Sequence, residues 1–109
     1  MTPPDREALR DRSHAVFGNR YVAEVVTAIA EETVDARPSI TVRMIASRTG
    51  LSDGLVKLVT KRLVNAKLLR PLPQERPRAP AYHEVQRSDG GWNALVNLCT
   101  RLADDALGG

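Results

Sequence analysis

Between residues 41 and 88 the chain carries ten Lys or Arg residues against three Asp or Glu residues, a balance of +7. The whole chain has a net charge of only +3, because the segments on either side are acidic. Clustered ammonium and guanidinium groups bind phosphate oxygens and the acceptor edges of bases, and they attract a polyanion at long range. The chemistry that these residues offer is therefore non-covalent binding of a polyanion. A basic face that is merely solvated is the alternative.

The remaining polar residues offer little for catalysis or for metal binding. There is no glycine-rich phosphate loop, no functional pair of carboxylates and no nucleophile with an adjacent base, so we expect the chain not to be an enzyme. Cys99 is the only cysteine, and His14 and His83 lie far from it in the sequence. We therefore expect no internal disulfide, no metal and no cofactor, with only a metal site shared between subunits left open.

Length and hydropathy indicate one domain without a membrane span. A chain of 109 residues can bury a modest core. No apolar run approaches the roughly 18 to 20 residues that a membrane helix needs, and no charged-then-apolar leader opens the sequence. The expected location is the cytoplasm, in association with the nucleoid.

The stretch 42–61, VRMIASRTGLSDGLVKLVTK, positions four of these ten cations, and it is typical of two short helices joined by a tight turn. Ala46 is small enough for a second helix to cross the first closely, and Gly50 takes the positive φ that ends the first helix. Ser52 can cap the second helix, and Val56 faces the core from it. We expect the first helix to run from a Thr41 cap to about residue 49 and the second to span 52–65, with either Asn65 or Lys67 taking a left-handed conformation after it.

Two further helices are expected before this stretch. After a disordered start at 1–4, the segment 5–17 predicts a loosely amphipathic helix. Its main apolar residues are Leu9, Val16 and Phe17. After an Asn19 cap, a core helix is indicated by apolar residues at helical spacing: Val22, Val25, Val26, Ile29 and Ala30. A loop is expected at 35–39, and Ile40 can pair briefly as a strand.

After the second motif helix, the sequence predicts a β-hairpin with strands at 68–72 and 81–86. Its loop, 73–80, is rich in proline and carries Arg76 and Arg78. The prolines make the loop stiff and extended. A last helix then starts at Trp92 and has a wide apolar stripe. Its main members are Trp92, Leu95, Cys99 and Leu102. We expect this stripe to form a dimer interface; folding back on its own subunit is the alternative.

This order of elements resembles the winged helix-turn-helix transcriptional regulators of the MarR, ArsR and PadR type. The resemblance implies a mainly α fold with a small β-hairpin (α+β), with an extra helix at each end. It divides the chain into an N-terminal tail and helix (1–18), a DNA-binding domain (19–88) and a dimerisation helix (89–109). It further implies a homodimer that binds double-stranded DNA. The helix 52–65 would enter the major groove, and the loop 73–80, the wing, would reach the flanking backbone or minor groove.

Carried over by position, the resemblance implies a set of DNA-binding residues: Arg43, Arg48, Ser52, Gly54, Lys57, Lys61, Arg62, Arg76 and Arg78. It identifies neither an operator nor a small-molecule effector, nor whether binding represses or activates. Asp53 brings a negative charge to this face, and Leu55 and Leu58 bring apolar side chains. Leu55 and Leu58 favour one alternative, a winged-helix module that binds another protein. A weakly specific DNA-coating protein is the other alternative.

Overall fold

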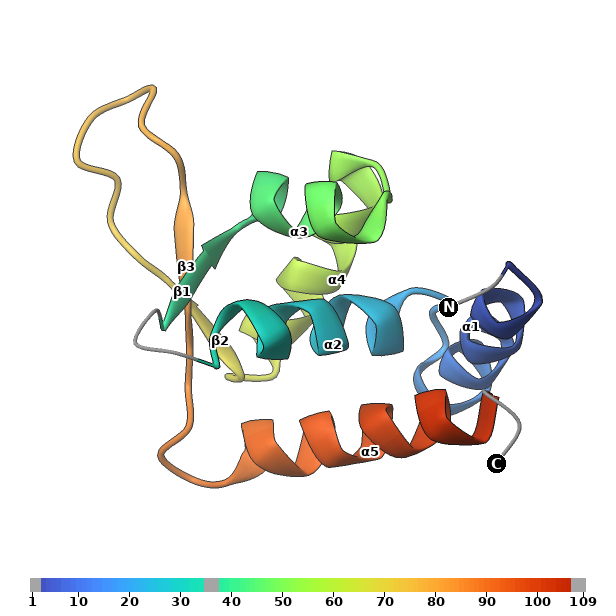
Figure 1. The fold of residues 1–109 in the computed structure, drawn as a ribbon. Coiled ribbons are helices and arrows are strands. Elements are labelled where there is room, and N and C mark those ends of the chain that lie inside the picture. Colours follow the sequence, from blue (N-terminus) through green and yellow to red (C-terminus); the bar gives the residue numbers. More distant parts are fainter. Residues whose placement is uncertain (1–2, 35–37, 107–109) are drawn as a thin grey trace.

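The computed structural model describes residues 3–34 and 38–106, and this part of the chain forms an α+β fold (Figure 1). Its elements, in order, are α1 (Pro3–Phe17), α2 (Val22–Glu32), β1 (Ser39–Thr41), α3 (Val42–Thr49), α4 (Asp53–Asn65), β2 (Leu69–Pro71), β3 (Tyr82–Val85) and α5 (Gly91–Ala106). The predicted coarse class, helices with a small β-hairpin, is confirmed. Within the described residues, no helix combines the length and apolarity that a membrane span needs.

Helix α2 is the centre of the core. It contacts α1 and α5 on one side and α3 and α4 on the other, as Figure 1 shows. Val25, Val26 and Ile29 are completely buried, which confirms the face that their spacing predicts. Leu9, Val56 and Trp92, which come from α1, α4 and α5, belong to the same buried cluster. The predicted segments 1–18, 19–88 and 89–109 therefore contribute to one core.

The three strands form an antiparallel sheet in the order β1-β3-β2. Ile40 of β1 lies opposite His83 of β3, and Pro71 of β2 lies opposite His83 on the other side. The predicted hairpin and the brief strand at Ile40 are confirmed, but β2 and β3 are shorter than the predicted 68–72 and 81–86. Backbone pairing continues just past these ends, because the Leu72 N–H donates to the Tyr82 carbonyl at 2.9 Å and the Gln86 N–H donates to the Leu68 carbonyl at 3.0 Å. Pro73 and Pro80 have no N–H group to extend the ladder into the loop.

The turn between α3 and α4 follows its local chemistry. The Thr41 hydroxyl oxygen accepts a hydrogen bond from the Met44 N–H at 3.2 Å and caps α3. Gly50 has φ +77°, and its N–H donates to the Ala46 carbonyl at 2.9 Å. The Ser52 hydroxyl oxygen accepts from the Leu55 N–H at 3.2 Å and caps α4. These predictions are confirmed, as is the left-handed Lys67, whose φ is 66°.

The variant Gly50→Ala is expected to lower the free energy of unfolding by about 1–2 kcal/mol, because a Cβ atom is strained at positive φ. Gly54→Ala is the matched control. Gly54 lies inside α4, and an added Cβ would meet no atom nearer than Ser52 Oγ at 3.9 Å. Ala there is expected to be neutral or to stabilise by about 0.5–1 kcal/mol. Urea unfolding followed by circular dichroism measures both, and equal losses would contradict the role assigned to Gly50.

The N-terminal helix differs from its prediction in two respects. It begins at Pro3 rather than at residue 5, since proline is tolerated in the first turn, where its missing N–H is not needed. Val16, predicted to be one of its main apolar residues, is 50% exposed, whereas Leu9 is 2% exposed. The helix packs through the face that carries Leu9 and Ser13. Val16, seven residues after Leu9, lies on the same side but in the last turn of the helix, where it stays half exposed. Residues 1–2 of the predicted disordered start, and 35–37 of the predicted loop, are outside the described residues.

The predicted Asn19 cap is also displaced. The residue that precedes α2 is Tyr21, and its side chain makes no capping hydrogen bond. The Asn19 carboxamide oxygen instead accepts from the Tyr21 N–H at 2.8 Å, one turn too early to cap the helix. The Ala23 N–H, in the first turn of α2, has its hydrogen-bond partner on another helix. It donates to the Ser13 hydroxyl of α1 at 3.1 Å. A cap supplied by α1 leaves no signal in the sequence next to α2.

The apolar stripe of α5 is covered by the same chain. Trp92 is 1% exposed and Cys99 is fully buried, while Leu95 and Leu102 are half-buried against the core. Helices α1 and α2 together provide the surface that α5 covers. Trp92 and Cys99 are therefore covered by their own subunit, as in the alternative of folding back, whereas Leu95 and Leu102 are only partly covered. The dimer itself stays a prediction. Burial raises the pKa of the Cys99 thiol to about 12, so this thiol stays protonated at neutral pH.

Candidate nucleic-acid interface

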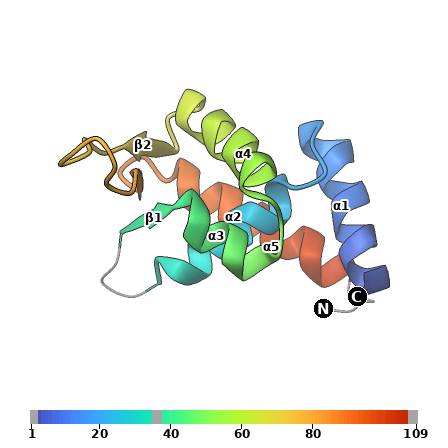
Figure 2. The same ribbon diagram turned by 90° about the horizontal axis from the view of Figure 1, so that it is seen from above.

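A groove of about 710 Å³ lies between α3 and α4 on one side and the base of the β2–β3 hairpin on the other. Figure 2 shows the same two helices beside the hairpin, on the opposite side of α2 from α5. Lys57 and Lys61 line the wall formed by α4, and Tyr82 and His83 line the wall formed by the hairpin. Both lysines are exposed. The groove therefore has a cationic wall and a largely apolar one.

The buried face of α4 determines which side of the helix the lysines occupy, and that side lines the groove. Val56, Val59 and Leu63 recur at helical spacing and are buried against the core. Lys57 and Lys61 are four residues apart and consequently share another face of the helix. Like charges at this spacing repel each other, so they do not help the helix to form. Their position is consistent with a role outside the fold itself.

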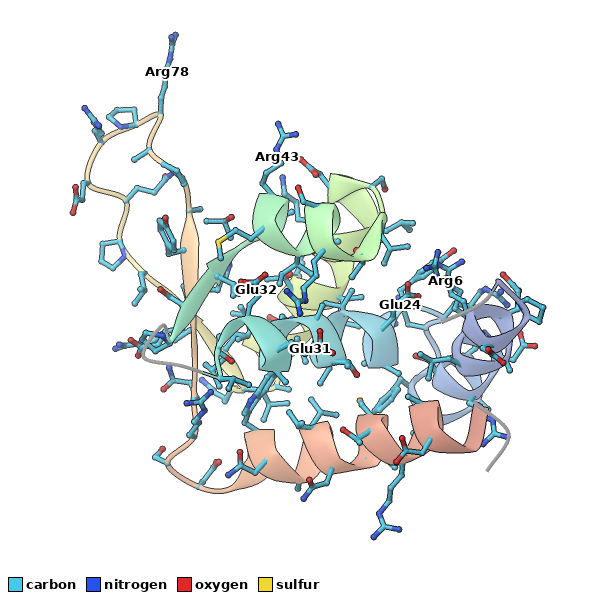
Figure 3. The ribbon with its side chains drawn as sticks, in the orientation of Figure 1. Arg6, Glu24, Glu31, Glu32, Arg43 and Arg78 are labelled. Atoms are coloured by element: carbon cyan, nitrogen blue, oxygen red, sulfur yellow. The ribbon has the colours of Figure 1, made fainter. Side chains whose placement is uncertain are left out.

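Arg43 lies at the edge of this groove. Its side chain is 83% exposed, and its Nε atom is 4.0 Å from Oδ2 of Asp53. This pair joins the start of α3 to the start of α4 and partly neutralises the negative charge that Asp53 brings. Figure 3 shows Arg43 and Arg78 extending to the same side of the molecule, away from α5. The two arginines therefore border one face, although 35 residues separate them in the sequence.

The hairpin loop holds Arg76 and Arg78 away from the body of the protein, and both are exposed. The Gln74 side-chain amide donates to the Ala79 carbonyl at 2.6 Å, and the Ala79 N–H donates to the Arg76 carbonyl at 3.0 Å. These bonds close the loop on itself, and its prolines restrict it further. Less conformational entropy is then lost when the two guanidinium groups bind a partner.

Four cations of this face have no carboxylate within ion-pair distance in the described part of the chain: Lys57, Lys61, Arg76 and Arg78. Between α1 and α2 the pattern is different. Arg10 pairs with Glu24 at 2.8 Å, and Arg20 pairs with Glu7 at 2.7 Å. Positive charge is thus paired inside the helical body but left unpaired around the groove. We refer to Arg43, Lys57, Lys61, Arg76 and Arg78 as the groove cations.

No family model matches the chain, and a search of the curated proteins finds no match. Geometry and charge therefore carry the functional interpretation. Within residues 3–34 and 38–106 there is also no group of three or more His, Cys, Asp or Glu side chains that could hold a metal ion.

Ser52 and Gly54, at the start of α4, are both exposed. The Ser52 oxygen already accepts the Leu55 N–H, but its hydroxyl hydrogen remains available for donation. At Gly54 no side chain covers the backbone, and open space surrounds the position that a Cβ would occupy. An external group can therefore approach the backbone of the first turn of α4.

Arg48 and Arg62, two of the predicted DNA-binding residues, are engaged elsewhere. The Arg48 guanidinium bonds Glu31 at 2.6 Å and Glu32 at 3.0 Å, and these carboxylates hold the pKa of Arg48 above its ordinary value. Arg62 donates to the Phe17 carbonyl at 3.0 Å, at the connection between α1 and α2. Both side chains extend toward the helical body because their positions on α3 and α4 face it. Neither lines the groove.

Arg48→Ala is accordingly expected to leave the affinity for any polyanion that binds the groove within about twofold of the wild-type value, since its charge is already compensated. Lys57→Ala, which removes a groove cation, should weaken the same binding clearly. Fluorescence anisotropy with a labelled DNA duplex compares the two variants. A large loss of affinity on Arg48→Ala would mean that the arginine leaves Glu31 and Glu32 to contact the partner.

The sequence prediction missed His83 as part of this site. Its side chain lines the groove, and its buried Nδ1 atom has no hydrogen-bond partner among the described residues. Burial lowers the pKa of the imidazole below its ordinary value, so it is neutral at pH 7. The alternating pattern of residues 82–85 predicts which residues share a face of the strand, but not that one face would meet α3 and α4. Only the packing of the hairpin reveals this wall.

Proposed function

We propose that this chain is a DNA-binding regulator with a winged helix-turn-helix fold, in which α4 is the recognition helix and the 73–80 loop is the wing. One observation carries the proposal: Arg43, Lys57 and Lys61 line one groove, Arg76 and Arg78 extend from the hairpin loop beside it, and four of these five cations have no carboxylate partner in the described chain. A polyanion that extends from α4 to the hairpin would contact these cations together and neutralise their charge. Duplex DNA supplies such a surface.

In the proposed complex, the exposed side of α4 lies in the major groove. Lys57 then reaches a guanine edge or a phosphate, and Lys61 lies toward the backbone. The free N–H groups at the start of α4, near Gly54, are suited to a phosphate, because a helix N-terminus carries partial positive charge. Arg76 and Arg78 contact the flanking backbone or the minor groove. Asp53, which is close to Arg43, can accept a hydrogen bond from cytosine N4.

A homodimer belongs to this proposal, because two recognition helices about 34 Å apart fit successive major grooves. Trp92 and Cys99 are buried within the subunit, so the second subunit has to use a different surface. Light scattering on the complex with DNA measures how many chains bind one duplex.

An electrophoretic shift across a salt series tests the proposal, with a random duplex pool compared with a duplex selected from that pool. We expect both to shift at low salt, with the selected duplex retaining its shift at higher salt. Equal behaviour of the two duplexes would favour the weakly specific coating protein. A complete lack of shift at low salt would favour the protein-binding module, for which Leu58, 58% exposed on α4, is the main support.

Arg78→Ala should weaken duplex binding to a similar extent for every sequence, because a backbone contact carries no base information. The slope of log affinity against log salt should fall in magnitude by about 1. Arg101→Ala is the matched control, since Arg101 is an exposed arginine of α5, on the opposite side of the molecule (Figure 1). An unchanged slope for Arg78→Ala would remove the hairpin loop from the proposed interface.

A further inference from the structure

Leu58 is an apolar side chain on the cationic side of α4. It is 58% exposed, and it belongs neither to the core nor to the partly buried residues that pack against the core. Its neighbours on the exposed surface of the helix are Lys57 and Lys61. Leaving a leucine in water gains nothing for folding, because its burial against apolar surface is what stabilises a protein.

Gly54, one turn before Leu58, is likewise unexplained by the fold. Its φ is not positive, and an added Cβ would have open space around it apart from Ser52 Oγ at 3.9 Å. Ala at such a helical position is more favourable than Gly. Helical side chains lean toward the N-terminus, so Leu58 extends over the turn that contains Gly54. Leu58 therefore presents an exposed apolar side chain beside a turn of helix backbone that carries no side chain at Gly54.

We propose that Leu58, beside the bare backbone at Gly54, contacts the 5-methyl group of a thymine in the major groove, so that it makes the protein prefer thymine-containing sites. This inference depends on the proposed function. The thymine methyl is the one apolar group that a base pair presents in the major groove, and it is small enough for a site with no side chain at Gly54. The adjacent Lys57 and Lys61 favour a polyanion as the occupant, because an apolar protein surface would leave their charges uncompensated.

The test compares an alternating A·T duplex with the same duplex in which uracil replaces thymine, a change that removes only the methyl groups. By fluorescence anisotropy, the wild-type protein is expected to bind the uracil duplex about fourfold more weakly, which corresponds to one methyl group buried. Leu58→Ala should bind both duplexes with equal affinity. Leu98→Ala removes an exposed leucine from α5 and is the matched control; it should keep the wild-type ratio.

Each outcome of this experiment is decisive. Equal wild-type affinity for the thymine and uracil duplexes would overturn the inference and leave the proposed function intact. A preference that persists in Leu58→Ala would mean that another residue contacts the methyl group, so the assignment of Leu58 would be wrong. If neither duplex binds at low salt, the proposed function and the inference fail together. Because Leu58 is exposed, Leu58→Ala should fold, and circular dichroism verifies this.

Discussion

The double variant Lys57→Ala/Lys61→Ala is expected to bind duplex DNA about 60-fold more weakly per subunit than the wild-type protein near 0.1 M salt. Each lysine contact with a phosphate releases about 0.9 of a counterion, so two lost contacts reduce the affinity by this factor. Both lysines are exposed and have no carboxylate partner in the described chain, so their charge is available to the partner. A fluorescence anisotropy titration at several salt concentrations gives both the affinity and the salt slope.

The salt slope separates lost contacts from a damaged fold. For the double lysine variant the magnitude of the slope should fall by about 2, whereas partial unfolding would reduce the active fraction at every salt concentration alike. Arg101→Ala, on α5, serves as the control for a simple change in net charge, and its slope should equal that of the wild type. An unchanged slope in the double variant would exclude the α4 side of the groove as a contact with phosphates.

Trp92→Ala is expected to lower the free energy of unfolding by about 3–5 kcal/mol, because it removes the largest fully buried side chain and leaves a cavity. Urea unfolding should be followed by circular dichroism, since Trp92 is the only tryptophan and its fluorescence is lost in the variant. The control Leu98→Ala truncates an exposed residue of the same helix, so it should change the stability by no more than about 0.5 kcal/mol.

Protein concentration distinguishes the two possible positions of Trp92. If it lies in the core of its own subunit, the destabilisation should be the same at low and high protein concentration. If it lay in a dimer interface, the stability of the wild-type protein would rise with concentration and that of Trp92→Ala would not. A concentration-dependent loss would therefore contradict the packing of α5 on α1 and α2.

Local chemistry accounts for the elements that were predicted correctly. Thr41 and Ser52 cap α3 and α4 through N–H groups three residues ahead, and Gly50 ends α3 through a carbonyl four residues behind. Such interactions depend on neighbours in the sequence, so residue types and spacing are enough to predict them. The core face of α2 was predictable for the same reason, because its apolar residues recur with the helical period.

Interactions between distant segments account for what the sequence did not predict. Arg48 is an ordinary surface arginine in the sequence, yet Glu31 and Glu32, 17 and 16 residues earlier respectively, neutralise it. The Asn19 cap was displaced because Ser13 supplies a cap to α2 from another helix. Neither partnership produces a periodic pattern or a local motif. Both depend on how helices meet in space.

The apolar stripe of α5 shows the same difference between local interactions and interactions of distant segments. Its spacing predicts a helix that must bury one face, and that is confirmed by Trp92 and Cys99. A stripe does not specify the surface that covers it, because any apolar surface can do so. The sequence alone therefore determined the helices, the caps of α3 and α4, the hairpin and the excess of positive charge between residues 41 and 88. Tertiary structure alone decided which of those charges remain unpaired and what covers α5. It also decided that Lys57 and His83 face each other across one groove. Each of these results depends on contacts between segments that are far apart along the chain.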